Sequence, residues 1–292
     1  MISPADELAR EADGPAFADA VTFAFGDPDR SLYGLARLGL SGGGAGSALA
    51  ILFAGRDPVA AVARGGVDAG GVGFESLALD GLSATIVEPL AHWTVALDAG
   101  EHSFELAFQA LGPPAEVEPG EAVVRLGGMA GYEQLCAVTG TVRTGGRAHA
   151  IECLGQRGHT WGAPDWTRIE SARTIAAWPA EGAALAYSAI RPSGAGDHAA
   201  EATWAALLDA GGSRRVAEPR LSTTYDPEGR QRRAGLELWL GDEDGYPERA
   251  SGRVLCGSSL DLGKLRLDCA FFGWSLDGRP AVGRYDILRR AS

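Results

Sequence analysis

The residues best suited to chemistry lie close together between Gln156 and Trp166, in the run QRGHTWGAPDW. This run holds an arginine, a histidine, an aspartate and two tryptophans, interleaved with glycines. Histidine exchanges protons near neutral pH, and an aspartate can orient an imidazole ring or act as a base. Indole rings line apolar pockets and keep one N–H donor available. The run is therefore a candidate for a pocket wall that carries an acid–base group.

Each candidate in this run has an expected role. His159 is the general acid–base group, and Asp165 is the carboxylate that orients it. The Arg157 guanidinium is expected to hold an anionic or carbonyl oxygen. The remaining candidates contact the substrate: Gln156, Trp161 and Trp166.

A second pair of candidates precedes the run. Tyr132 and Glu133 could supply a phenol and a further carboxylate to the same site, or they could be a surface tyrosine beside a solvated acid. The run itself also has a structural interpretation, because isolated histidines and tryptophans most often serve packing. It would then be a bulged strand whose tryptophans fill a barrel core, with Arg157 and Asp165 as a supporting ion pair.

Several classes of site lack their motifs. Neither the other histidines nor the four cysteines show an HxH, HExxH or CxxC spacing, so we expect no metal site. No GxSxG elbow is present, and no GxGxxG falls between a strand and a helix, so hydrolase and dinucleotide-binding folds are not supported. We expect no cofactor. The histidines outside the run are His92, His102, His149 and His198.

The elements that must position these residues are short strands. Apolar residues recur at every second position in runs separated by glycine-rich turns, which is typical of antiparallel sheets. Three hairpins are expected, with strands at 93–97 and 103–108, at 138–142 and 148–153, and at 265–272 and 282–288. Residues 199–208 allow either a helix or a strand. The prediction is an all-β protein, built as sandwiches or barrels.

The clearest change of composition is the connector Gly112–Gly120, whose three prolines cannot donate to a sheet ladder. We therefore divide the chain into an N-terminal domain, 1–118, and a C-terminal domain, 119–292. The net charge of −12 argues against nucleic-acid and anionic-lipid partners. No secretory signal precedes residue 14, and no apolar run approaches the roughly 18 residues of a membrane span. A cytoplasmic location is expected.

Two segments, Gly131–Trp166 and the closing strands up to Arg279, resemble the hydroxyneurosporene synthase (carotenoid 1,2-hydratase) and AttH-like superfamily. The matching residues read GYEQLC, VTGTV, GQRGHTWG and DW, and the late segment reads WSLDGR. The resemblance implies two consecutive lipocalin-like β-domains around a hydrophobic cavity. It also implies cofactor-free hydration or cyclisation of an alkene, in which an acid protonates the double bond and aromatic faces stabilise the cation.

One position departs from that family. Many relatives read Asp-His-Ser-Trp-Gly where this chain has Gly158 in place of the aspartate. The missing acid would have to be replaced by Asp165, Glu133 or Glu170. The leading hypothesis is a lyase or isomerase that acts on a hydrophobic terpenoid or polyketide. The alternatives are a lipocalin-like carrier of an apolar metabolite and a scaffold whose cavity is filled by side chains.

Overall fold

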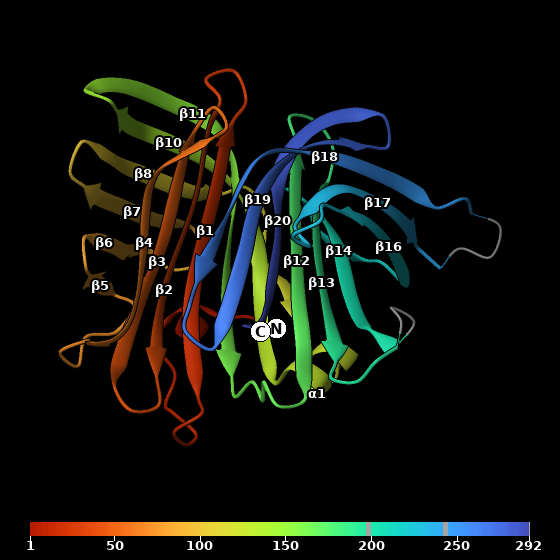
Figure 1. The fold of residues 1–292 in the computed structure, drawn as a ribbon, viewed down its shortest axis with the longest axis horizontal. Coiled ribbons are helices and arrows are strands. Elements are labelled where there is room, and N and C mark those ends of the chain that lie inside the picture. The colour runs from red at the N-terminus through yellow and green to blue at the C-terminus, as the bar shows by residue number, and fades with distance from the viewer. Residues whose placement is uncertain (197–199, 242–244, 292) are drawn as a thin grey trace.

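The structure is a computed structural model that describes residues 1–196, 200–241 and 245–291. It contains two curved antiparallel sheets that lie side by side (Figure 1). The first has eleven strands, from β1 (Ala18–Asp27) to β11 (Arg147–Gly162), and the second has nine, from β12 (Ile169–Pro179) to β20 (Arg279–Arg290). The predicted all-β class, with two lipocalin-like units, is confirmed.

Both sheets follow the same path. In each sheet, the first four strands lie side by side in reverse order. The last strand pairs with the first strand, and the remaining strands follow the last one in decreasing order. The first sheet therefore reads β4-β3-β2-β1-β11-β10-β8-β7-β6-β5, with β9 beside β10, and the second reads β15-β14-β13-β12-β20-β19-β18-β17-β16. The bounds of the other elements are η1 (Pro4–Glu7), β2 (Leu32–Ser41), β3 (Ala45–Ala54), β4 (Asp57–Asp68), β5 (Ser76–Leu79), β6 (Leu82–Glu88), β7 (His92–Ala99), β8 (His102–Ala110), β9 (Ala115–Val117), α1 (Ala122–Gly127), β10 (Met129–Thr144), β13 (Ala184–Pro192), β14 (Ala202–Asp209), β15 (Gly212–Arg215), β16 (Glu218–Tyr225), β17 (Gln231–Trp239), β18 (Glu248–Asp261) and β19 (Leu265–Leu276).

The three expected hairpins are confirmed as β7–β8, β10–β11 and β19–β20. The ambiguous segment at 199–208 forms strand β14 from Ala202, and its first residue lies outside the described residues, as does His198. The glycine-rich run after Cys153 differs from expectation, because β11 continues through it to Gly162 instead of ending before it. Its glycines serve close strand packing: a Cβ on Gly155 would collide with the Ala24 carbonyl of β1.

The change from one sheet to the other occurs between Gly162 and Ile169. The proposed division at 118 and 119 does not coincide with it, because β10 pairs with β8 and β11 pairs with β1 inside the first sheet. The connector Gly112–Gly120 is also less irregular than expected, since its residues Ala115–Val117 form β9. As a boundary between folding units, 118/119 stays a prediction.

Apolar side chains form three cores. One core packs inside the first sheet and includes Trp93. Another packs inside the second sheet and includes Phe272. The third lies between the two sheets, where Tyr33 and Phe53 of the first meet Phe271 of the second. Because strand side chains alternate between faces, each central strand contributes to its own barrel and to this shared layer. Among the described residues, no helix is long and apolar enough to cross a membrane.

Candidate functional site

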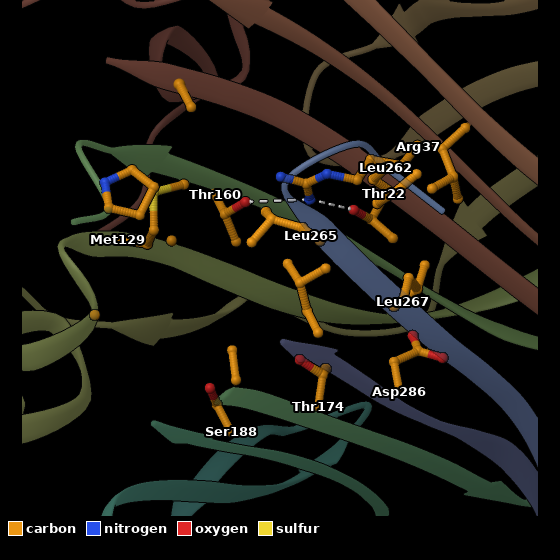
Figure 2. Close-up of a pocket in the computed structure, with 18 of the residues that line it drawn as sticks. Thr22, Arg37, Met129, Thr160, Thr174, Ser188, Leu262, Leu265, Leu267 and Asp286 are labelled. Atoms are coloured by element: carbon orange, nitrogen blue, oxygen red, sulfur yellow. Dashed lines mark hydrogen bonds between the residues drawn. The ribbon is translucent and has the colours of Figure 1, made fainter. Parts of the chain in front are cut away.

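A cavity of about 700 Å³ lies between the two sheets. Its volume is in the range of small-molecule sites. Most of its wall is apolar, and the polar side chains come from the central strands of both sheets (Figure 2). Apolar residues of the wall include Leu49, Val123, Met129, Trp166, Ile190, Trp204, Leu262, Leu265, Leu267 and Leu288.

On the first sheet, one cross-strand row carries the polar groups. Glu133 of β10 pairs with Gly158 of β11, Gly158 pairs with Thr22 of β1, and Thr22 pairs with Arg37 of β2. Directly paired residues share a face of the sheet, so all four positions face the cavity. The row places a carboxylate and a guanidinium at its two ends, with a glycine and a threonine between them.

Gly158 makes room for the Glu133 carboxylate. A Cβ atom built at Gly158 would lie 2.6 Å from Oε2 of Glu133. The carboxylate of Glu133 therefore occupies the space into which a side chain at position 158 would project. The Gln156 amide fixes it by donating from Nε2 to Oε2 of Glu133 at 2.7 Å. An acid is thus present beside position 158, but the neighbouring strand supplies it.

The surroundings of Glu133 favour its protonated form. Burial raises the pKa of the Glu133 carboxyl above its ordinary value of 4.5, and the nearby Arg284 guanidinium opposes this rise without cancelling it. A carboxyl that retains its proton at higher pH, in a cavity with apolar walls, is suited to general acid catalysis.

A second polar row faces the first from the other sheet. Ser188 of β13 pairs with Thr174 of β12, which pairs with Asp286 of β20. Arg284, two residues before Asp286, donates from its NH1 nitrogen to Asp286 Oδ2 at 2.8 Å. Burial raises the pKa of the Asp286 carboxyl despite this contact. Figure 2 shows Ser188, Thr174 and Asp286 on the opposite side of the cavity from Thr22 and Thr160.

The expected acid–base group, His159, points away from the cavity. It follows Gly158 on β11, so it faces the interior of the first barrel. There it is fully buried, and its Nε2 lies 2.6 Å from Oδ1 of Asp19, with the rings of Phe74 and Tyr132 packed around it. The expected pairing of His159 with Asp165 is absent, because Asp165 lies in an exposed turn and accepts hydrogen bonds from Thr167.

Arg157 and Tyr132 belong to the same interior cluster as His159. The Glu7 carboxylate, from the short helix η1, accepts hydrogen bonds from Arg157 NH1 and from the Tyr132 hydroxyl. It also accepts from the Trp93 indole at 2.8 Å and from the Leu90 amide at 2.7 Å. Arg157 is therefore paired with Glu7 and not with Asp165. The N-terminal segment closes this part of the barrel with a buried carboxylate.

The two tryptophans of the run, Trp161 and Trp166, lie in different places. Trp166 lines the cavity, whereas Trp161 lies outside it, with the Arg10 guanidinium 3.6 Å from its ring centroid. Of the predicted site residues, Glu133 and Trp166 line the cavity, and Gln156 contacts the Glu133 carboxylate. Tyr132 forms part of the wall, although its hydroxyl is bonded to Glu7.

Sequence reasoning missed Arg37, Thr22, Arg284 and Asp286. A signal for three of them was present: each is a charged residue inside an otherwise apolar strand, in the runs LARLGL and GRYDIL. A charge in a buried strand is rare unless it is paired or functional. Among the described residues, no cluster of three or more histidines, cysteines or acids could hold a metal ion.

Comparison with known proteins shows which family the chain belongs to. A family model described as a domain of unknown function, DUF7064, matches residues 3–290. The chain belongs to the DUF7064 family. No curated protein matches its sequence.

Three solved structures share the fold of this DUF7064 protein over nearly the whole chain. A candidate AttH of Nitrosomonas europaea has a TM-score of 0.70 at 15% identity, covering 94% of this chain and 92% of its own. CghA with Sch210972 has a TM-score of 0.65 at 14% identity, covering 95% and 89%. Kievitone hydratase of Nectria haematococca has a TM-score of 0.65 at 11% identity, covering 94% and 89%. The expected AttH-like fold is thereby confirmed.

Proposed function

We propose that this protein is a cofactor-independent lyase or isomerase that hydrates, dehydrates or cyclises an apolar small molecule, such as a terpenoid or polyketide. The reaction takes place in the cavity between the sheets, with Glu133 as the proton donor. The observation that carries this proposal is the Glu133 carboxyl, which faces the cavity in the space left by Gly158 and is held by Gln156.

The reaction begins with proton transfer from the Glu133 carboxyl to one carbon of a C=C bond. The π electrons form the new C–H bond, and the other carbon becomes cationic. Water, or a nucleophile within the same molecule, then bonds to this carbon. The proton that is released returns to the Glu133 carboxylate, which restores the acid. Attack by water gives hydration, its reverse gives dehydration, and internal attack gives cyclisation.

Gln156 and two tryptophans of the cavity wall support these steps. The Gln156 amide holds one carboxyl oxygen and leaves the other to carry the proton. Trp166 and Trp204 provide aromatic surface at the cavity, which stabilises a developing cation. His159 takes no part in this scheme, because its imidazole is engaged by Asp19 inside the barrel.

The shared fold is compatible with this chemistry. Kievitone hydratase bears the name of a hydration enzyme and has the same architecture. The architecture alone does not transfer a reaction from one protein to another. The proposal therefore depends on Glu133 and the cavity around it.

Exchange with solvent tests the proposal even while the substrate is unidentified. The wild-type protein is incubated in D2O with an extract of apolar metabolites, and the mixture is followed by mass spectrometry. We expect a compound that is converted and that gains a carbon-bound deuterium, because Glu133 takes its proton from water. Compounds that are bound and released unchanged, with none converted, would identify a carrier and overturn the proposal.

A further inference from the structure

Arg37 is partly buried, and within the described part of the chain it lacks the carboxylate partner that the buried Arg157 and Arg284 have. It stands near the middle of β2, and its NH1 nitrogen donates to the Thr22 hydroxyl at 2.9 Å (Figure 2). The same nitrogen lies 3.5 Å from the Thr160 hydroxyl. Among the described residues, no carboxylate lies within 4.0 Å of Arg37 that would form an ion pair. The side chains that it contacts by hydrogen bonding are neutral hydroxyls.

Arg37 lines the cavity and is partly buried, so part of its hydration is lost with no ion pair from the described residues to replace it. Arg157 and Arg284, by contrast, are buried, and each contacts a carboxylate, Glu7 or Asp286. Buried charges are ordinarily paired, since an isolated one loses its hydration without compensation. Burial lowers the pKa of Arg37 to about 10, so the guanidinium still carries its charge at neutral pH. A partner from outside the chain would complete this site.

The neighbourhood of Arg37 indicates what that partner is. Thr22 and Thr160 supply hydroxyls beside the guanidinium, and leucines from the β18–β19 connection and β19 lie close by (Figure 2). A planar guanidinium matches an oxygen anion whose charge is shared between two atoms. The leucines, Leu262, Leu265 and Leu267, match an apolar body.

We infer that Arg37 and Thr22 form a subsite for the carboxylate of an otherwise apolar substrate. This inference names the substrate class of the proposed function and rests on it. The backbone positions of Arg37 and Glu133 lie at opposite ends of one row that spans four strands. Neighbouring strands are about 4.8 Å apart, so the two backbone positions are roughly 14 Å apart. The Arg37 side chain reaches back across β1 to the Thr160 hydroxyl of β11, the strand next to Glu133. The anionic group therefore lies on the same wall of the cavity as the double bond that Glu133 protonates.

Binding of a matched pair of probes tests this subsite. Naphthylacetic acid and naphthylacetamide have nearly the same shape, and only the acid carries an anion at neutral pH. Calorimetric titration of the wild-type protein should show the acid binding about tenfold to hundredfold more tightly than the amide. The R37Q protein should bind the two probes with affinities within about twofold of each other, because the cation that separates them is gone.

Three further variants sharpen the result. R37K retains the charge and should retain part of the preference for the acid. R56Q removes an exposed arginine in the turn between β3 and β4 and should leave the preference unchanged. E133Q should keep the preference, which separates anion binding from catalysis. Equal binding of acid and amide to the wild-type protein, no binding of either, or a preference that persists in R37Q would each overturn the inference. The wild-type comparison decides even if R37Q does not fold.

Discussion

Replacing Glu133 by glutamine should lower the turnover of the converted compound by roughly a hundredfold to ten thousandfold, which is the usual contribution of a general acid. Glutamine has nearly the same shape as glutamate and can still contact Gln156, but its amide is far too weak an acid to protonate a double bond. The deuterium incorporated per unit time, measured for E133Q and wild type, gives the ratio. Turnover within a few-fold of wild type would exclude Glu133 as the proton donor.

Two further variants separate the role of the carboxyl from that of the fold. E152Q makes the same chemical change at an exposed position of β11 and should be fully active. The double variant E133A/G158D carries its acid on the neighbouring strand, where it would project into the space that Glu133 vacates. It should be more active than E133A alone. Equal activity of these two proteins would show that a carboxyl in this space is not sufficient.

The E7A protein should lose about 3–5 kcal/mol of unfolding free energy, which is the usual cost of removing one partner of a buried ion pair. The substitution leaves the Arg157 guanidinium, the Tyr132 hydroxyl and the Trp93 indole without their common acceptor. Equilibrium denaturation by urea measures the difference. E11A, which removes an exposed acid of the same segment, should change stability by less than about 0.5 kcal/mol. A loss of similar size in both variants would contradict this assignment.

The effect of Glu7 should depend on pH in one direction. Burial alone would raise its pKa, but the Arg157 charge and the hydrogen bonds outweigh burial, and the pKa lies below the ordinary value of 4.5. A carboxyl with a lowered pKa stabilises the fold above its unfolded pKa and loses that contribution as pH falls through its folded pKa. The stability difference between wild type and E7Q should therefore shrink as the pH falls below 4.5.

The sequence predicted the strands better than the site. Alternating apolar residues indicated the hairpins, because one face of each strand is buried and the pattern is local. The same alternation explains the error at the chemical run. Gly158 faces the cavity, whereas Arg157 and His159 face the barrel interior, so residues adjacent in sequence serve different places. Their partners, Glu7 and Asp19, are far away along the chain and carry no local signal.

The positions of Glu133 and of the anion subsite could not be predicted from the sequence either, because both depend on how the strands pair. Glu133 could be proposed from its family context, but its position beside Gly158 depends on the register of β10 against β11. Arg37 is a single charge in an apolar run, and the pattern does not reveal that it joins the same row as Glu133. Only the pairing of four strands brings these residues to one wall.

An infrared titration of Glu133 shows without any substrate whether this side chain can be the proton donor. The difference spectrum of wild type minus E133Q isolates the protonated-carboxyl stretch of this one side chain. If Glu133 is the proton donor, its band should persist to a pH above 4.5, the ordinary midpoint for glutamate, because burial in the cavity disfavours the charged form. A midpoint at or below 4.5 would show a carboxylate that is ionised at working pH, and Glu133 could then not be the proton donor.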